Sequence, residues 1–126
     1  MGIKFIIEKK QNQNAYGTIT WSEKKLKSGA VSGPYGKGEL PLGLYHAVGG
    51  KLVKSPKEGF CDSLKNCWFQ LIEPQFSTDR TGLGIHPDGN VSGTQGCIGL
   101  LDSDTSAWYA AFKSIPAGTI VMVEVL

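Results

Sequence analysis

Runs of alternating or clustered apolar residues along the chain predict a series of short β-strands. Each run is rich in strand-forming residues and is bounded by glycine, proline or polar segments. The predicted strands are residues 2–8, 16–21, 43–48, 67–73, 81–86 and 119–125. Gly49 and Gly50 are expected to end the third strand, and Pro74 the fourth. Residues 28–39, which are rich in glycine, are expected to form an irregular connection.

One segment follows helical periodicity. In DSDTSAWYAAFKSI, residues typical of helix N-caps come first and apolar residues then recur at helical spacing. These apolar positions are Trp108, Ala111, Phe112 and Ile115. Pro116 and Gly118 are expected to end the helix. The sequence therefore predicts a mainly β fold, a compact β-sandwich or barrel with one short α-helix after Cys97.

The composition agrees with a single globular domain that spans residues 1–126. The chain has 40% hydrophobic and 19% charged residues, and its 17 glycines and 6 prolines agree with many turns. The net charge of +2 is too small to indicate a nucleic-acid partner. No stretch approaches the roughly 18 consecutive apolar residues of a membrane span. The charged start MGIKFIIEKK differs from a secretory leader, so we expect a chain made in the cytoplasm without a signal peptide.

The chemically reactive side chains are few, and two of them lie in one glycine-rich segment. His86 precedes Cys97 within GIHPDGNVSGTQGCIGL, and such polypeptide can bring a thiol to an imidazole. An imidazole within hydrogen-bond reach stabilises a thiolate, which makes the cysteine a nucleophile. The backbone N–H groups of Gly96 and Cys97 are expected to form an oxyanion hole. The other imidazole nitrogen is expected to bond a main-chain carbonyl near Pro87 or the Asp88 carboxylate, and the carbonyl is favoured.

Other roles stay open for the same residues. Cys97 can be a small buried hydrophobe, and His86 can satisfy a local hydrogen bond. A zinc site made of Cys61, Cys67, His86 and Cys97 is a rival, although the usual Cys-x2-4-Cys knuckle is absent. Alternatively, Cys61 and Cys67 close a small disulfide loop in an oxidising compartment. Arg80 is a candidate to bind a substrate carboxylate or to form a surface salt bridge.

Two motifs give the chain a family resemblance. IHPDGNVSGTQGCIGL resembles the signature of the L,D-transpeptidase catalytic domain, in which a histidine is followed by a glycine-rich loop that ends in a Ser-His-Gly-Cys type run. ELPLGLYHA looks like that family's Thr-Pro-x-Gly-x-Phe strand, with Pro41, Gly43 and Tyr45 in matching places. The helix after the cysteine, followed by AGTIVMVEV, also matches the family's ending. The resemblance thus covers roughly residues 35–126.

The resemblance implies a peptidoglycan-modifying cysteine enzyme that uses no cofactor and no metal. Cys97 looks like the acylated nucleophile, His86 like the base, and the Gly96 and Cys97 amides like the oxyanion hole. The substrate-binding residues that it implies are Tyr45, Arg80, Thr94 and Gln95. Such enzymes attack the carbonyl of the diaminopimelate L-centre in a stem tetrapeptide, release D-alanine, and pass the acyl group to an amine or to water. The expected partners are peptidoglycan stem peptides and a delivery or immunity protein.

Three departures from the family pattern concern the fate of the acyl group. Gln95 stands where the family has a histidine, Gly99 stands where it has Arg or Asn, and the loop between His86 and Cys97 is shorter. These features are similar to the compact branch found in secreted antibacterial effectors and phage lytic proteins. We therefore expect L,D-carboxypeptidase or D-amino-acid exchange activity in the periplasm or cell wall, after delivery or release. A non-catalytic cell-wall binding or inhibitor module on the same fold is the alternative.

Overall fold

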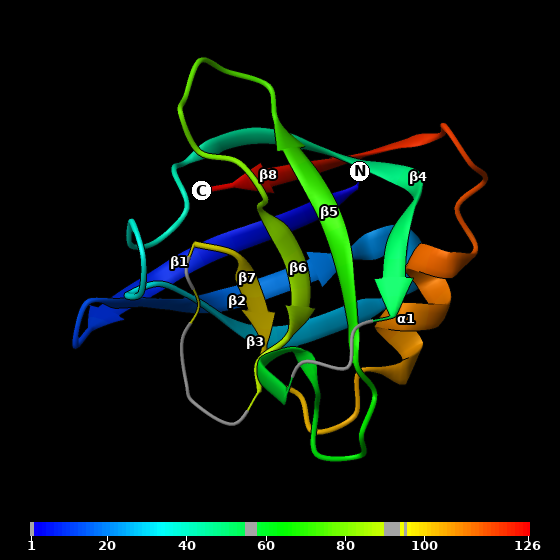
Figure 1. Cartoon of the computed structure of the whole chain (residues 1–126), viewed down its shortest axis with the longest axis horizontal. Helices are drawn as coiled ribbons and strands as arrows, with labels where there is room; N and C mark the ends of the chain where they lie inside the picture. Colours follow the sequence, from blue (N-terminus) through cyan, green and yellow to red (C-terminus); the bar gives the residue numbers. More distant parts are fainter. Residues whose placement is uncertain (1, 55–57, 90–93, 95) are drawn as a thin grey trace.

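The chain folds into a closed barrel of eight β-strands with one α-helix (Figure 1). The computed structural model describes residues 2–54, 58–89, 94 and 96–126. The strands are β1 (Ile3–Gln11), β2 (Asn14–Trp21), β3 (Leu26–Ser32), β4 (Gly43–Lys54), β5 (Trp68–Pro74), β6 (Gly84–Pro87), β7 (Ile98–Leu100) and β8 (Ile120–Val125). The connections carry the helix α1 (Ser106–Lys113) and two 3-10 turns, η1 (Ser22–Lys24) and η2 (Glu58–Phe60). The predicted mainly β fold with a short helix after Cys97 is confirmed, and it is a barrel.

Around the barrel the strands follow the order β1-β2-β3-β7-β6-β5-β4-β8, and β8 closes on β1. Two neighbouring pairs, β1 with β8 and β6 with β7, are parallel. The remaining pairs of the order are antiparallel. The β1–β2 hairpin turns at Asn12 and Gln13, whose φ angles of 53° and 66° are typical of a two-residue type I′ turn. Among the described residues, no helix is long and apolar enough to cross a membrane.

The barrel interior and α1 form one apolar core. Alternate residues of each strand point inwards, and Ile85 of β6 and Ile98 of β7 are among those fully buried there. The helix covers the barrel end where β2 stops and β5 starts. Its Phe112 ring lies between Trp21 and Trp68, with centroid distances of 4.9 and 5.7 Å. The aromatic side chains of α1 thus fill the end of the barrel core.

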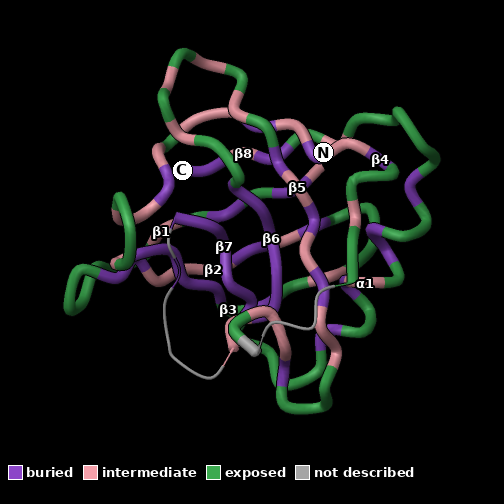
Figure 2. The backbone as a smooth tube through the Cα atoms, in the orientation of Figure 1, coloured by how far each residue is buried: buried purple, intermediate pink, exposed green. Residues whose placement is uncertain are grey.

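β6 and β7 are buried on both faces, unlike strands that cover a core on one side only (Figure 2). His86 and Gly99 pair with each other and face away from the barrel interior. This outer face is covered by the chain itself. A Cβ on Gly99 would lie 3.0 Å from both the Asp88 Cβ and the Thr94 Cγ2. The outer face of β6 and β7 is therefore a covered, water-poor surface.

The glycine-rich segment that we expected to be an irregular connection is partly a strand. Residues 28–32 belong to β3, which pairs with β2 on one side and β7 on the other. Gly29 pairs with Thr18 there, because hydrogen bonding from both neighbours outweighs the weak strand propensity of glycine. β7 itself was not predicted, since three residues carry no measurable periodicity.

β4 also continues beyond the position where we expected it to end. It runs through Gly49 and Gly50 to Lys54, and its register against β5 shifts between Ala47 and Leu52. A Cβ at Gly49 would collide with the Pro116 carbonyl oxygen. The glycine is required for this close approach of the chain after α1, and it does not break the strand.

A matched pair of glycine substitutions tests this packing. Gly17 of β2 and Gly29 of β3 lie one position apart in the same ladder. A Cβ on Gly17 would collide with the Ile6 carbonyl oxygen, so Gly17→Ala should lower the free energy of unfolding by about 2–4 kcal/mol. A Cβ on Gly29 meets Leu101 at 3.6 Å, an ordinary contact, so Gly29→Ala should change that free energy by less than about 1 kcal/mol. Urea unfolding measures both, and equal destabilisation would contradict the described packing of β2 against β1.

Candidate active site

β6 and β7 bring the two predicted catalytic residues to one face of the barrel wall, where the two strands lie side by side (Figure 1). The pairing is parallel, with His86 opposite Gly99. Cys97 directly precedes β7, and its thiol accepts a hydrogen bond from the Gly84 N–H at the start of β6. Cys97 therefore lies beside β6, near the strand position two residues before His86.

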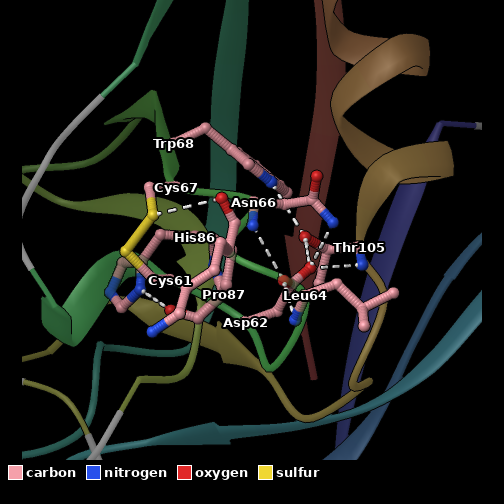
Figure 3. Close-up of a disulfide and its surroundings, with 10 residues drawn as sticks. Cys61, Asp62, Leu64, Asn66, Cys67, Trp68, His86, Pro87 and Thr105 are labelled. Atoms are coloured by element: carbon pink, nitrogen blue, oxygen red, sulfur yellow. Dashed lines mark hydrogen bonds between the residues drawn. A yellow bond between two sulfur atoms is a disulfide. The ribbon is translucent and has the colours of Figure 1, made fainter.

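The backbone next to His86 fixes the tautomer of its imidazole. The Nδ1 atom lies 2.6 Å from the Pro87 carbonyl oxygen (Figure 3). A carbonyl oxygen can only accept a hydrogen bond, so Nδ1 carries the proton and Nε2 of the neutral ring is an acceptor. The main-chain carbonyl that the sequence analysis favoured over the Asp88 carboxylate is thus the partner of this ring.

Two aromatic rings pack against the imidazole, and neither belongs to a motif that the sequence reveals. The Phe60 ring of η2 lies 4.3 Å from the His86 ring between centroids, and the Phe69 ring of β5 stacks on it at 6.1 Å. His86 is 3% exposed. Burial lowers the pKa of His86 to about 4, against a smaller opposite effect of the Pro87 hydrogen bond. The imidazole is therefore neutral at pH 7 and able to accept a proton.

Cys97 is the free thiol of the chain and is 8% exposed. Its Sγ lies 3.8 Å from the Gly82 carbonyl oxygen. Burial raises the pKa of the Cys97 thiol, although a backbone hydrogen bond from Gly84 and the charge of Arg80 act in the opposite direction. The resting site thus favours a neutral thiol with a neutral imidazole. This differs from the stabilised thiolate expected from the sequence, because that expectation left out the cost of burying a charge.

The Thr94 hydroxyl fixes the turn that carries Cys97. Its Oγ1 donates to the Cys97 carbonyl oxygen at 2.7 Å and accepts from the N–H groups of Gly96 at 3.1 Å and Gly33 at 3.2 Å. The Gly96 N–H is therefore occupied, which corrects the expectation that it forms half of an oxyanion hole. Within the described residues the Cys97 N–H donates no hydrogen bond, so it is the amide left for that role. Thr94, with its hydroxyl fully engaged, positions the turn and is not the substrate contact we expected.

Arg80 lies directly against the same turn. Its guanidinium donates to the carbonyl oxygens of Gly38 at 2.9 Å and Glu39 at 3.2 Å. A Cβ on Gly96, whose φ is +113°, would collide with this guanidinium. Arg80 forms no salt bridge with any described residue, although its charge contributes to the lowered pKa of Asp79, after the larger effect of Lys37. Beside it opens a shallow pocket of about 200 Å³ lined by Gly36, Lys37, Asp79, Arg80, Thr81 and Leu83. A guanidinium without a salt bridge at such a pocket suits an anionic group.

Tyr45 is a core residue, which corrects its expected role as a substrate contact. The side chain is fully buried, and its hydroxyl donates to the Pro41 carbonyl oxygen at 2.6 Å. Burial raises the pKa of Tyr45 to about 12. The register of β4 in the barrel decides which way this side chain points, and a single strand motif does not contain that information. Gln95, the remaining expected substrate contact, lies outside the described residues.

Cys61 and Cys67 form a disulfide (Figure 3). The small disulfide loop that the sequence offered as an alternative is therefore confirmed. The bond also uses two of the four ligands that the rival zinc site requires. In residues 2–54, 58–89, 94 and 96–126, no group of three or more His, Cys, Asp or Glu side chains is arranged to hold a metal ion.

The buried His86 should make the stability of the fold depend on pH. Its pKa is about 4 in the folded chain and ordinarily 6.5, so the unfolded chain binds more protons between these values. Stability is then full above pH 6.5 and falls as the pH drops towards 4, by up to roughly 3 kcal/mol. His86→Asn keeps an N–H donor for Pro87 and should lack this loss, whereas His46→Asn on β4 should retain it. Urea unfolding at pH 7 and pH 4 compares the three chains, and an unchanged loss in His86→Asn would contradict a neutral buried imidazole.

The Thr94 hydroxyl is testable by an isosteric substitution. Thr94→Val leaves the Cys97 carbonyl and the Gly96 and Gly33 N–H groups without their partner. We expect the free energy of unfolding to fall by about 2–4 kcal/mol. Thr94→Ser keeps the hydroxyl and should cost less than about 1 kcal/mol. If the valine and serine variants unfold at the same urea concentration, the three hydrogen bonds do not hold the turn.

Comparisons with family models, curated proteins and solved structures find no match to this chain. The function is therefore inferred from the chemistry and geometry of the residues described above.

Proposed function

We propose that the chain is a cysteine enzyme of the L,D-transpeptidase type that acts on peptidoglycan stem peptides. One observation carries the proposal: the Cys97 thiol lies against Gly84 of the strand that carries His86, and the Pro87 carbonyl holds the imidazole with Nε2 as an acceptor. General-base activation of a thiol requires an imidazole nitrogen that is free to take the proton. Neutral forms of both groups are the correct starting states for that transfer.

The proposed reaction consists of two acyl transfers. His86 Nε2 takes the proton of Cys97 while the sulfur attacks the carbonyl carbon of the diaminopimelate L-centre. The Cys97 N–H donates to the oxygen that becomes negatively charged. The C–N bond to the terminal D-alanine then breaks, His86 returns the proton to the leaving amine, and a thioester remains on Cys97. Water or the amine of a D-amino acid attacks the thioester, loses a proton to His86, and the thiol forms again.

Arg80 is the residue that we assign to a carboxylate of the stem peptide. Its guanidinium now donates to the carbonyl oxygens of Gly38 and Glu39, and a carboxylate is a stronger acceptor than either. Exchange of these partners would release the Gly38 and Glu39 carbonyl oxygens from Arg80 beside Gly96. Lys37 contributes less to binding, because its 2.8 Å ion pair with Asp79 is largely exposed to solvent.

The surroundings of Gly99 favour hydrolysis or exchange over cross-linking. Its missing side chain corresponds to an Arg or Asn in the family that the chain resembles. A Cβ there would already lie within 3.0–3.2 Å of Asp88 and Thr94, so no larger polar side chain fits. A cross-linking enzyme must hold a second stem peptide by ordered contacts until its amine reaches the thioester. Water and small D-amino acids need no such groove.

The Cys61–Cys67 disulfide supports a place of action outside the cytoplasm. Disulfides persist in oxidising compartments such as the periplasm, where peptidoglycan is also found. Delivery or release after synthesis would bring the chain there, and a protein that damages the wall requires an immunity partner in its producer. These partners belong to the proposal of an antibacterial or lytic role.

A non-catalytic wall-binding or inhibitor module is the second candidate. The raised pKa of the Cys97 thiol, caused by burial, and the occupied Gly96 N–H favour it. Both features reduce the nucleophile and the oxyanion stabilisation that turnover needs. Such a module would keep the Arg80 pocket for binding.

The purified chain should convert disaccharide tetrapeptide to disaccharide tripeptide and free D-alanine. Mass spectrometry measures these products. Cys97→Ala should give no product, and His86→Asn should lower kcat by roughly 100-fold or more. Arg80→Gln should raise KM by about tenfold for the free carboxylate substrate and leave an amidated one unchanged. With added D-methionine, the exchanged tetrapeptide and the tripeptide should exceed directly joined dimers.

Two results would reject parts of this proposal. Absence of product from the unmodified chain, with binding to sacculi that persists in Cys97→Ala, would support the non-catalytic module. Dimers as the main product would restore a cross-linking role.

A further inference from the structure

The disulfide lies between the two chain segments that supply the rings around His86 (Figure 3). Phe60 immediately precedes Cys61, and Phe69 follows Cys67 by two residues. The two phenyl rings lie 5.4 Å apart between centroids, and both contact the imidazole. One covalent bond thus joins the segments that enclose His86.

The two rings are held in different ways. Phe69 belongs to β5, whose antiparallel register with β6 places it opposite His86. A Cβ on Gly84 would collide with the Phe69 ring, so this ring also lies over β6. Phe60 stands outside the barrel strands, on the single turn η2. The Cys61–Cys67 disulfide attaches η2 to the start of β5, and a 3.1 Å hydrogen bond from Gly89 N–H to the Gly59 carbonyl attaches it to the end of β6. The disulfide therefore ties the segment that carries Phe60 to the barrel, whereas Phe69 belongs to a barrel strand itself.

The rest of the disulfide loop has an anchor of its own. The Asp62 carboxylate accepts from the Thr105 N–H at 2.7 Å, the Thr105 hydroxyl at 2.8 Å and the Asn66 N–H at 2.9 Å. Burial alone would raise the pKa of Asp62, but these hydrogen bonds from Thr105 and Asn66 lower it overall. The charged carboxylate thus ties the loop to the start of α1. Cys61 and Cys67 also pair through an antiparallel backbone bridge. Opening the disulfide would therefore remove the covalent tie of η2 to β5 and leave this bridge and the Asp62 contacts.

We propose that Phe60 is a positioning residue for His86 and that the Cys61–Cys67 disulfide holds it in place, so that only the oxidised chain keeps the imidazole in its working orientation. This inference rests on the proposed function, in which His86 is the base. The Phe60 ring covers one face of the imidazole, opposes rotation away from the Pro87 carbonyl, and excludes water from the ring. Reduction by a dithiol converts the disulfide to two thiols, while the dithiol loses two electrons and two protons and closes to its own disulfide.

Neighbouring charges do not explain the environment of His86. Among the described side chains, the titratable ones on the flanking segments are Cys97 before β7, Asp88 after β6 and Asp62 in the disulfide loop. The low pKa of His86 is due to burial, opposed by the Pro87 hydrogen bond, without a contribution from these groups. The pKa of His86 therefore reports how well the rings cover it.

The test follows the His86 imidazole by NMR titration, with His46→Asn to assign the second histidine, and measures kcat and KM on the tetrapeptide. Phe60→Ala and the double variant Cys61→Ser/Cys67→Ser should each raise the pKa of His86 by about one unit or more towards its ordinary value. Each should lower kcat about tenfold or more with KM nearly unchanged. Phe60→Tyr should restore the unmodified behaviour, and Phe76→Leu, whose ring packs on Tyr45, should change neither quantity.

An unshifted His86 titration in either Phe60→Ala or the double serine variant would overturn the inference. If a variant fails to fold, dithiothreitol added to the unmodified chain gives the same readout, because the free Cys97 is already reduced. A reduced chain that keeps His86 at its original pKa would also overturn it. The titration needs no turnover, so an inactive unmodified chain would reject the proposed function and leave the role of Phe60 to be decided by NMR.

Discussion

The parallel pairing of β6 with β7 is the constraint on which the candidate site depends. A chain that leaves β6 at Pro87 must travel back before it can run beside that strand in the same direction. The connection, residues 88–97, is short for such a crossover, so its ends stay close to the sheet. Asp88 and Thr94 accordingly cover the outer face of β7 at Gly99. The same connection ends at Cys97, next to the strand that carries His86. The strand order of the barrel therefore also decides that these two side chains are neighbours.

Covering this face sets the protonation states of the site. Removal of water from the thiol and the imidazole disfavours the charged form of each, and the pKa of Cys97 rises while that of His86 falls. A neutral pair at rest avoids two buried charges that would need full compensation. In the proposed reaction, the Cys97 thiolate would therefore form only when the thiol proton moves to Nε2 of His86. In the proposed reaction, catalysis by such a pair would follow substrate binding at Arg80.

The elements predicted well are those whose signal is long and local. The spacing of Trp108, Ala111 and Phe112 identified α1, because apolar residues recur at the helical period over about two turns. The strand ends were predicted less well. Glycine in β3 and β4 was read as a break, although neighbouring strands supply the hydrogen bonds that keep both segments extended. A sequence window holds no information about which strand lies beside it, and for short strands the neighbour decides.

The sequence by itself determined the reactive inventory: one histidine ahead of one unpaired cysteine in a glycine-rich segment, two further cysteines close enough to bridge, and a carbonyl next to His86 for its ring. These relations are local, so the chain alone contains them. The tertiary structure decided the rest. It buried Tyr45, engaged the Gly96 N–H with Thr94, placed Arg80 on the turn and packed Phe60 and Phe69 together against the imidazole. Each of these depends on strand register and on a crossover path, which place residues far apart in sequence within contact distance and remove water from between them.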